Sequence, residues 1–417
     1  MTAAVHIVGA GLSGLSTAVQ LTKAGKHVFV YEAANHAGGR CRSYFDQTLN
    51  RRIDNGNHLV LSGNQAVAKY LGAVGAADSL WETERAEFPF VDLRSGERWV
   101  VRPDQGIVPW SLISPSKRVP GGSIGEYLRG LRLAFAGPDK TVGACLDQNG
   151  PLYHRFWEPL AVSVLNTDPS EASARLLWPV LRETFGRGER ACRALIAKEG
   201  LSESFIDPAC RFLEREGGVV ALGTRIKSLG SKGAQVSSLR CAERLVDIDA
   251  GDRVVLAVPP SIAQGLVPNL TVPNEFRAIV NAHFKLPGPP SPEVSFVGLV
   301  GGIGHWLFVR DGIASVTVSA AEHIIDQSAE ELAHNLWPEI ITALELGAEA
   351  LGSFRIVKEK RATFAQTPEQ VRKRPEPKTS LTNLFVAGDW TATGLPATIE
   401  GSLLSGELAA EAVLKSL

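Results

Sequence analysis

Apolar positions at the start of the chain follow two different spacings. Residues 5–8 (VHIV) and 27–31 (HVFVY) are short apolar runs that predict buried strands. Between them, apolar residues recur at the spacing of one helix face, at Leu15, Ala18, Val19 and Leu21. Gly25 marks the end of this helix. A strand, a helix and a strand in this order predict a parallel α/β sheet.

Later apolar runs predict further strands of the same unit. Residues 219–222 and 224–229 are expected to pair with each other, and residues 253–258 predict a strand that stops at two prolines. Residues 383–387 predict a last strand. The helix after it carries an apolar face made of Leu403, Leu404, Leu408, Ala409 and Val413.

The intervening segments predict a second unit, which contains an antiparallel sheet and helices. Four runs are expected to form the sheet: 282–286, 294–300, 305–309 and 313–319. Residues 170–185 predict an amphipathic helix capped by Ser170, and residues 328–346 predict a helix kinked at Pro338. The basic, proline-rich residues 367–380 predict a solvated loop.

Length and composition limit the class of protein. The 417 residues exceed one small domain and suggest two or three. Lys and Arg number 43 against 44 Asp and Glu, a net charge of −1, which disfavours general electrostatic binding to nucleic acid. Five scattered cysteines without a CxxC predict neither a disulfide framework nor a thiolate metal site, and they fit a reducing cytoplasm. We find no secretory signal and no membrane-spanning run of about 18 apolar residues.

The turn after the first strand is a GxGxxG motif that suits a dinucleotide. Gly9 permits a tight turn, Gly11 lets a pyrophosphate approach bare backbone, and Gly14 lets the helix pack closely on the strand. The helix begins at Leu12 and Ser13, whose unpaired N–H groups attract a phosphate. A glycine turn alone is weak evidence, but here strand, glycines, helix, second strand and an acid follow in register.

An acid and a second pair of glycines come next. Glu32 can accept hydrogen bonds from an adenosine ribose, and its charge disfavours NADP. After Ala33, the loop glycines Gly38 and Gly39 would let the chain pass close to the pyrophosphate. Arg40 is expected to pair with that phosphate, and its alternative role is a surface salt bridge. This EAANHAGGR segment resembles the glutathione-reductase-like FAD proteins of the amine oxidase and phytoene desaturase type.

The same resemblance assigns roles to residues near the C-terminus. It implies that Gly388 and Asp389 hold the ribityl or phosphate region of FAD. It also implies that backbone N–H groups near Thr398 and Ile399 face the flavin. A helix N-terminus at this place would stabilise negative charge on the reduced ring.

The resemblance further implies a Rossmann-like FAD-binding domain assembled from three stretches: 1–62, 205–272 and 352–417. Within it, Ile226 would contribute a backbone contact to the adenine end, and the strand that ends at Val258 would cross beneath the nucleotide. The substrate-binding domain is expected from 63–204 and 273–351, as an inserted antiparallel sheet with helices. The fold class is therefore α/β with an α+β substrate domain.

Three segments narrow the resemblance: IDNGNH at 53–58, FWEPLAVSVLNT at 156–167 and KRATFAQTP at 360–368. With the terminal motifs, they resemble the bacterial squalene-associated FAD enzymes of hopanoid biosynthesis, the hydroxysqualene dehydroxylases, from one end of the chain to the other. This implies that hydroxysqualene, a long apolar isoprenoid, loses its allylic hydroxyl as water while reduced flavin N5 delivers hydride to carbon. Such a reaction needs a proton donor and a dry cavity.

The resemblance brings residues 53–58 toward the isoalloxazine, which makes Asn57 a cofactor contact and His58 a candidate acid. The alternative for His58 is a structural hydrogen bond to the cofactor loop. Glu158 is a second candidate acid, with a helix-face or capping carboxylate as its alternative. Asn166 would orient the hydroxyl or the flavin, or else tie down a turn before Pro169.

Several alternatives stay open at this point. A phytoene-type desaturase, an amine oxidase or a non-catalytic FAD- or lipid-binding partner would share the same cofactor motifs. The sequence has no second GxGxxG, so the electron donor to the flavin is expected outside this chain. Residues 106–113 are apolar and precede Lys117 and Arg118. They predict either a loop that dips into membrane headgroups or ordinary core covered by a basic edge.

Overall fold

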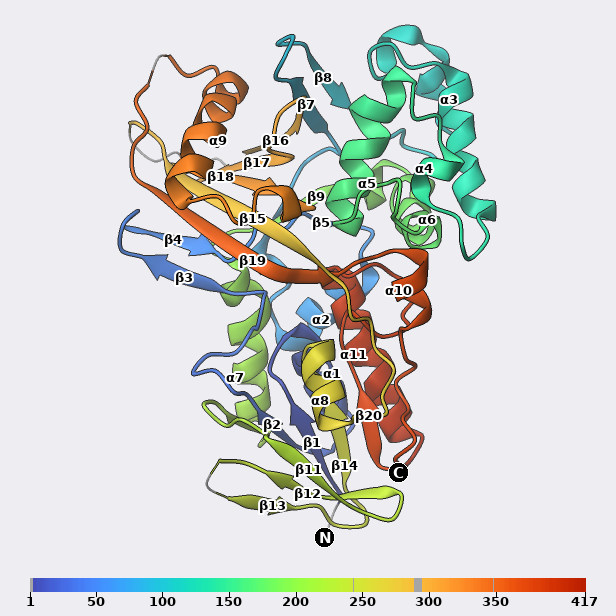
Figure 1. The fold of residues 1–417 in the computed structure, drawn as a ribbon, viewed down its shortest axis with the longest axis vertical. Helices are drawn as coiled ribbons and strands as arrows, with labels where there is room; N and C mark the ends of the chain where they lie inside the picture. The colour runs from blue at the N-terminus through green and yellow to red at the C-terminus, as the bar shows by residue number, and fades with distance from the viewer. Residues whose placement is uncertain (1–2, 243, 289–294, 348) are drawn as a thin grey trace.

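The computed structural model of the chain describes residues 3–242, 244–288, 295–347 and 349–417. The lower half of the molecule in Figure 1 is built on a sheet of five strands in the order β10-β2-β1-β14-β20. These strands are β10 (Val219–Ala221), β2 (His27–Tyr31), β1 (Ala4–Val8), β14 (Arg253–Leu256) and β20 (Leu384–Val386). All four pairings are parallel, so the predicted parallel α/β sheet is confirmed.

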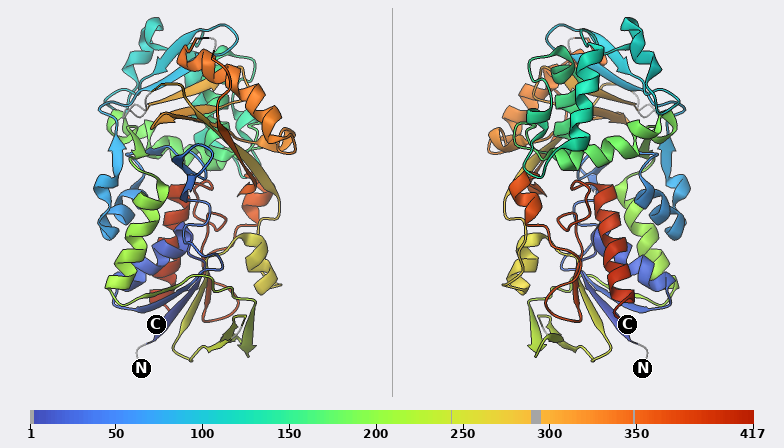
Figure 2. Two further views of the ribbon diagram at one scale, coloured as in Figure 1. Left: turned by 90° about the vertical axis from the view of Figure 1, so that its left-hand side faces the viewer. Right: turned by 90° about the vertical axis from the view of Figure 1, so that its right-hand side faces the viewer.

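Both faces of this sheet are covered, as the apolar runs require. Successive side chains of β14 point to opposite faces: Val255 packs with the helices, and Val254 and Leu256 pack with a small second sheet. The helices are α1 (Leu12–Lys23), α2 (Gln65–Val74), α7 (Asp207–Arg215) and α11 (Ile399–Leu414). The opposite face carries α8 (Pro260–Leu266) and the antiparallel strands β11 (Ser228–Lys232), β12 (Gln235–Arg240) and β13 (Leu245–Asp247). Figure 2 shows the two layers on either side of the sheet.

The predicted pairing of residues 219–222 with 224–229 is wrong. Residues 219–221 extend the parallel sheet beside β2, and β11 pairs with β12 instead. The chain changes direction at Gly223, which has a φ of +64°. Backbone hydrogen bonds fix this turn, because Gly223 donates to Ala34 and Thr224 donates to Glu32.

The upper half contains a sheet of seven strands in the order β19-β15-β18-β17-β16-β7-β8. Its strands are β19 (Phe354–Phe364), β15 (Phe276–Lys285), β18 (Ile313–Val318), β17 (Trp306–Arg310), β16 (Ser295–Val300), β7 (Phe88–Asp92) and β8 (Arg98–Val101). The four predicted strands are thus found, although Val294 lies outside the described residues. The sheet is mixed rather than antiparallel throughout, because β16 and β7 run parallel.

Helix α9 (Ala329–Leu344) covers one face of this sheet, as Figure 1 shows. Ser328 caps it with a complete capping box, since Ser328 and Glu331 each accept a hydrogen bond from the other's backbone N–H. The predicted helix at 328–346 is confirmed, and Pro338 lies inside it. The other side of the sheet carries α3 (Ile124–Arg129), α4 (Val142–Cys145), α5 (Glu158–Leu165) and α6 (Ala174–Glu183).

Two local predictions need correction. The helix expected from Ser170 begins later, with Ser173 as its N-cap, because the backbone N–H and hydroxyl of Ser170 bond to Asp168. The segment expected to be a solvated loop contains a helix, α10 (Pro368–Arg372). Thr367 caps α10, and proline suits its first position.

Two small sheets join the halves of the molecule. They are formed by β3 (Ser43–Asp46) with β4 (Arg51–Asp54), and by β5 (Val60–Leu61), β9 (Ala194–Ala197) and β6 (Leu80–Glu82). Strand β19 belongs to the seven-stranded sheet, although residues 352–417 were assigned to the FAD-binding domain. The predicted domain boundaries stay predictions.

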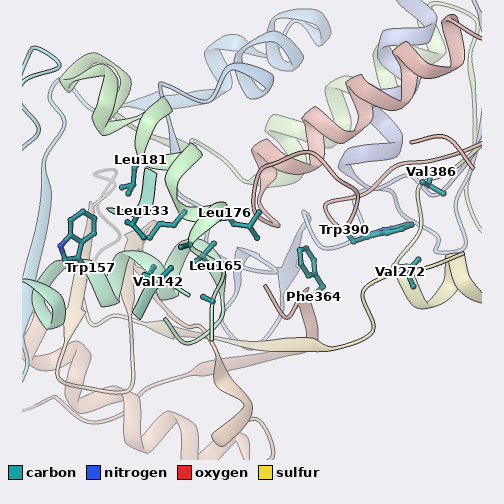
Figure 3. Close-up of a cluster of buried hydrophobic side chains, with 14 of the residues drawn as sticks. Leu133, Val142, Trp157, Leu165, Leu176, Leu181, Val272, Phe364, Val386 and Trp390 are labelled. Carbon is teal, nitrogen blue, oxygen red and sulfur yellow. The ribbon is translucent and has the colours of Figure 1, made fainter. Parts of the chain in front are cut away.

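One hydrophobic cluster runs across both halves. It includes Leu165 and Leu176 of the helices in the upper half and Val386 and Trp390 beside the parallel sheet. Figure 3 shows Phe364, at the end of β19, between these two groups. Within the described residues, the structure contains no helix with the length and apolar character needed to cross a membrane.

Candidate functional site

The glycine turn between β1 and α1 has the geometry expected of a dinucleotide site. A Cβ on Gly9 would lie 2.4 Å from the Ala257 carbonyl oxygen, and a Cβ on Gly14 would lie 2.0 Å from the Gly9 carbonyl oxygen. These two glycines allow the close packing of turn, helix and strand. A Cβ on Gly11 would meet no atom within 4 Å. Gly11 is the N-cap of α1 without a side-chain cap, so the first amides of the helix, including those of Leu12 and Ser13, face open space.

The acid at the end of β2 is fixed against this turn. The Glu32 carboxylate accepts hydrogen bonds from the backbone N–H groups of Ala10 and Ala34, both at 2.8 Å. Each carboxylate oxygen can accept further hydrogen bonds. Ala33, the next residue along the chain, is exposed. The position of Glu32 therefore fits the recognition of ribose hydroxyls that its sequence predicts.

The second glycine pair lies against the first turn. The Gly38 N–H donates to the Ala10 carbonyl at 2.8 Å, and a Cβ on Gly39 would lie 3.6 Å from the Cα of Gly11. Gly38 and Gly39 both adopt positive φ, at +107° and +58°. Because glycine takes these angles without strain, the loop can approach the open side of Gly11.

Arg40 and Asp389 join the two ends of the chain. Both carboxylate oxygens of Asp389 lie 2.9 Å from Nη2 of Arg40, and Arg40 also donates to the Ala362 carbonyl. The Asp389 side chain is buried, whereas the Arg40 side chain is 43% exposed. The carboxylate raises the pKa of Arg40, which stays charged. Arg40 therefore forms a salt bridge, which was its alternative role. Its partner is Asp389, the acid that the resemblance assigns to the same cofactor.

Arg374 is a residue that the sequence did not single out. It is buried, and it donates to the carbonyls of Asp389 and Leu395 and to the hydroxyl of Thr393. Burial lowers its pKa to about 10, so it remains protonated near pH 7. Arg374 lies in the basic segment that the sequence predicts to be a solvated loop. In the structure it follows α10, and its side chain is buried. It fixes the loop that carries Asp389.

The C-terminal helix begins where the sequence predicts. Thr398 is the N-cap of α11 and accepts a hydrogen bond from the Gly401 N–H at 3.1 Å, and Ile399 is its first residue. Upstream, a Cβ on Gly388 would lie 2.2 Å from Nε1 of Trp390. That indole nitrogen donates to the carbonyl of Val258 at 3.0 Å, so the loop is fixed against the end of β14.

The adenine-side candidate is Ile226, which is buried. It follows Thr224, whose N–H donates to the carbonyl of Glu32. Ile226 therefore lies two residues beyond Thr224, which is hydrogen-bonded to Glu32. Its role as a backbone contact to adenine stays a prediction.

The segment 53–58 connects to the seven-stranded sheet. The Asn57 amide nitrogen donates to the Ser315 carbonyl at 3.2 Å and to the Thr317 hydroxyl at 3.1 Å, both on β18. The structure therefore uses the Asn57 amide nitrogen to hold this loop. Its role as a cofactor contact stays a prediction.

His58 faces a hollow between β4, β9, β17 and β18, whose apolar lining includes Ile196, Leu201 and Phe308. The buried ion pair of Asp54 with Arg310, at 2.8 Å, lines the same hollow. His58 is an exposed residue, and the protein around its imidazole lowers its pKa. The imidazole is therefore neutral near pH 7. Asp54 opposes this shift, and Arg40 adds to it.

The other two catalytic candidates do not line this hollow. Glu158 is partly exposed at the start of α5, and its carboxylate lies 3.0 Å from Nδ1 of His154. Asn166 is buried at the C-cap of α5, where it donates to Thr363 and accepts from the Ala320 N–H. The amide of Asn166 is thus used to tie α5 to β19 and to Ala320, and it does not bond to the turn before Pro169. Neither position supports a catalytic role.

Gln366, which the sequence did not single out, belongs to the segment 360–368. It hydrogen-bonds to the segment 156–167 and to the start of the C-terminal helix. It is completely buried. Its side chain donates to the Leu165 carbonyl at 2.6 Å and accepts from the Ala397 N–H at 3.0 Å. Its backbone N–H donates to the Thr167 hydroxyl. Gln366 therefore joins the end of α5 to the residue just before the N-cap of α11.

Protonation of the buried His283 should destabilise the protein in acid. His283 is 1% exposed, hydrogen-bonds through Nδ1 to Ser315, and its pKa is lowered by burial to about 4 from 6.5. The unfolded chain therefore binds a proton over this range that the folded chain does not accept. The free energy of unfolding should fall by about 3 kcal/mol as pH drops from 6.5 to 4. Thermal unfolding followed by circular dichroism between these pH values measures this loss.

His283→Gln cannot take up the proton and should remove only the His283 share of this acid-side slope. His305, whose pKa is also lowered by burial to about 4, should keep a slope of its own. The exposed variant His334→Gln serves as the matched control and should keep the slope of the unaltered protein. An unchanged slope in His283→Gln would assign the acid sensitivity to other groups.

The combined arrangement fits an adenine dinucleotide flavin. A helix N-terminus open to a phosphate, an acid beside it and the Arg40–Asp389 pair lie around one glycine turn. The C-terminal motif adds a second helix N-terminus, which begins at Thr398. Across the described part of the chain, no group of three or more His, Cys, Asp or Glu side chains is placed to hold a metal ion.

The chain is similar to known proteins over its whole length. Residues 12–414 match the family described as flavin containing amine oxidoreductase. The hydroxysqualene dehydroxylase of Sinorhizobium fredii is 46% identical over 410 residues, which cover 98% of each chain. That of Rhodopseudomonas palustris is 46% identical over 415 residues, which cover 99% of each chain. Among solved structures, a cyclohexylamine oxidase from Brevibacterium oxydans shares the fold, with a TM-score of 0.67 at 16% identity over 100% of this chain and 99% of that one.

Proposed function

The chain belongs to the flavin-containing amine oxidoreductases and, within them, to the hydroxysqualene dehydroxylases, and from this membership we propose that it converts hydroxysqualene to squalene. It is a flavin-dependent oxidoreductase, and the flavin that we propose is FAD. The observation that carries the proposal is the similarity to hydroxysqualene dehydroxylases along the full length of both chains.

The proposed reaction replaces a C–O bond by a C–H bond at one allylic carbon. The hydroxyl would take up one proton, drawn from solvent, and leave as water, while the carbon would receive two electrons with the hydride. Reduced FAD, when bound, supplies that hydride. Since the sequence contains no second GxGxxG, we infer that the electrons reach the flavin from a donor outside this chain.

Residues on both ends of the chain would hold the FAD. Glu32 would accept hydrogen bonds from the adenosine ribose, and the open amides at the start of α1 would bind the pyrophosphate. Arg40 offers a charged donor to the same phosphates. The amides at Thr398 and Ile399 would favour negative charge on the reduced ring.

His58 is our candidate for the group that contacts the leaving hydroxyl. Its imidazole faces the hollow, and its lowered pKa keeps it neutral near pH 7. A neutral imidazole carries one N–H, so His58 would donate a hydrogen bond to the hydroxyl. The apolar walls at Ile196, Leu201 and Phe308 would exclude water from the ionising C–O bond.

An anaerobic single-turnover experiment tests this function. The FAD-loaded protein is reduced chemically, hydroxysqualene is added in detergent, and flavin absorbance and product mass are followed together. We expect the flavin to reoxidise while squalene forms in equal amount. A flavin that stays reduced, with no squalene formed, would contradict the dehydroxylase function. Oxidised protein would then be tested with phytoene and with amines.

Two variants of FAD-loaded protein resolve the acid assignment within the same experiment. His58→Ala should slow squalene formation by about 100-fold, because hydrogen-bond and acid catalysis contributes on this scale. Glu158→Gln should turn over normally, because Glu158 pairs with His154 and does not line the hollow. Normal turnover in His58→Ala would remove His58 from the mechanism and leave the overall reaction standing.

We place this reaction in the cytoplasm. The five cysteines are all free thiols, four of them buried, and a reducing compartment keeps them so.

A further inference from the structure

Helix α3 lies at the end of the molecule farthest from the two termini (Figure 1). Large apolar side chains on and near α3 are exposed. We call them the apolar face, and they are Trp110, Ile113, Ile124, Leu128, Leu131 and Phe135. Phe135 is 89% exposed and Trp110 is 69% exposed. The interpretation of residues 106–113 as ordinary core is therefore wrong, since these side chains point to solvent.

Two separate segments form this face, and hydrogen bonds hold them together. Trp110 and Ile113 lie in the short helix η2 (Trp110–Ile113). The other four lie along α3 and the helix η4 (Gly130–Phe135) that continues it. Arg118 donates to the Leu112 and Ile113 carbonyls, and the next residue, Val119, donates its N–H to the Tyr127 hydroxyl of α3.

The α3–η4 segment is apolar on two sides. Ile124 and Leu128 are four residues apart and share one side of α3, and Leu131 and Phe135 are exposed on the 3₁₀ helix η4 that continues it. The opposite side packs inward through Leu133 and through Gly130, where a Cβ would lie 2.6 Å from the Trp157 ring. Core packing therefore accounts for one apolar side and leaves the other without a partner in the described residues.

The charge around the apolar face is positive. Residues 104–136 contain four basic residues and two acids, Asp104 and Glu126, whereas the whole chain carries a net charge of −1. Asp104 accepts hydrogen bonds from Ser111 of η2, and Arg129 pairs with Asp147. The carboxylate of Glu126 is used within the fold, where it accepts from Ser123 and from the Leu152 N–H. Within the described part of the chain, the side chains of Lys117 and Arg132 form no ion pair or hydrogen bond.

We propose that the apolar face docks on a phospholipid bilayer that contains anionic lipids. Apolar side chains with basic residues beside them are the pattern of interfacial membrane attachment. Two copies of this chain, pairing this face with itself about a two-fold axis, would bring like charge against like charge. The purpose of docking rests on the proposed function, because a long apolar isoprenoid alcohol dissolves in the bilayer and would enter the protein from it.

Co-sedimentation of the full-length FAD-loaded protein with vesicles tests the docking. The vesicles contain phosphatidylcholine, with or without phosphatidylglycerol. The triple variant Trp110→Ser, Leu128→Ser, Phe135→Ser should lower the partition coefficient more than about tenfold. A matched triple variant at exposed apolar residues elsewhere, Phe45→Ser, Leu245→Ser, Ile262→Ser, should bind as the unaltered protein does.

The basic residues are tested separately. Lys117→Glu with Arg132→Glu should weaken binding to the phosphatidylglycerol vesicles by about fivefold or more per residue, and should have little effect on pure phosphatidylcholine. Unchanged partition of the apolar triple variant would overturn the proposal. So would a variant that loses self-association in analytical ultracentrifugation while still binding vesicles, since the face would then be an interface between copies. Turnover of hydroxysqualene in detergent, measured on the same triple variant, shows separately whether the proposed function holds.

Discussion

Replacing Gly11 with leucine should abolish flavin binding and leave the protein folded. Gly11 has an extended backbone, with φ −75° and ψ 177°, which leucine adopts without strain. A Cβ at this position meets no protein atom within 4 Å, so the new side chain fills the space in front of the α1 amides. We expect FAD affinity to fall by at least about 100-fold, or about 2.7 kcal/mol. Fluorescence titration of the FAD-free protein with FAD measures this change.

The fold of the variant is checked in the absence of flavin. Leucine at an N-cap costs about 1 kcal/mol relative to glycine, so thermal unfolding should shift only by a few degrees. Gly72→Leu is the matched control, because Gly72 is an exposed glycine of α2 whose Cβ would also meet no atom within 4 Å. Gly72→Leu should bind FAD normally. Retention of FAD by Gly11→Leu would show that the pyrophosphate lies elsewhere.

The sequence predicted the parts of the site that depend on backbone. Glycines at 9, 11 and 14, the acid Glu32 and the turn at Asp389 are local patterns with one geometric use, and each lies where expected. The positions of the strands could also be predicted, because each strand is a short, continuous run of apolar residues. The mistaken pairing of 219–222 with 224–229 arose because both segments favour strands, and only the turn at Gly223 sends them to different sheets.

Side-chain roles that depend on tertiary contacts could not be predicted. Glu158 and Asn166 looked alike in sequence, as polar residues among bulky apolar ones. The structure pairs the first with His154 near the surface and uses the second as a cap. Arg374 shows the reverse case, because its basic, proline-rich surroundings indicated solvent and the fold buries it against the Asp389 loop.

Gln366→Leu should destabilise the protein and change the properties of its flavin together. Leucine leaves the Ala397 N–H without its partner, whereas the Leu165 carbonyl still accepts a hydrogen bond from the Thr167 hydroxyl at 3.0 Å. The free energy of unfolding should therefore fall by about 1–3 kcal/mol. Ala397 lies just before the N-cap of α11, so the amides proposed to favour the reduced flavin would also lose their support. We expect the midpoint potential of the bound flavin to fall by about 30 mV, which corresponds to about 1.4 kcal/mol for two electrons.

Two further variants separate this positioning role from stability alone. Gln370→Leu removes another fully buried glutamine, whose side-chain oxygen accepts from the Asn274 N–H at 2.9 Å and contacts neither α5 nor α11. It should destabilise the protein and leave the flavin potential unchanged. Gln366→Glu can still accept from Ala397 but cannot donate to Leu165, so it should restore most of the potential and little of the stability. Equal potentials in Gln366→Leu and Gln370→Leu would reduce Gln366 to a structural residue, because loss of stability alone would then explain both variants.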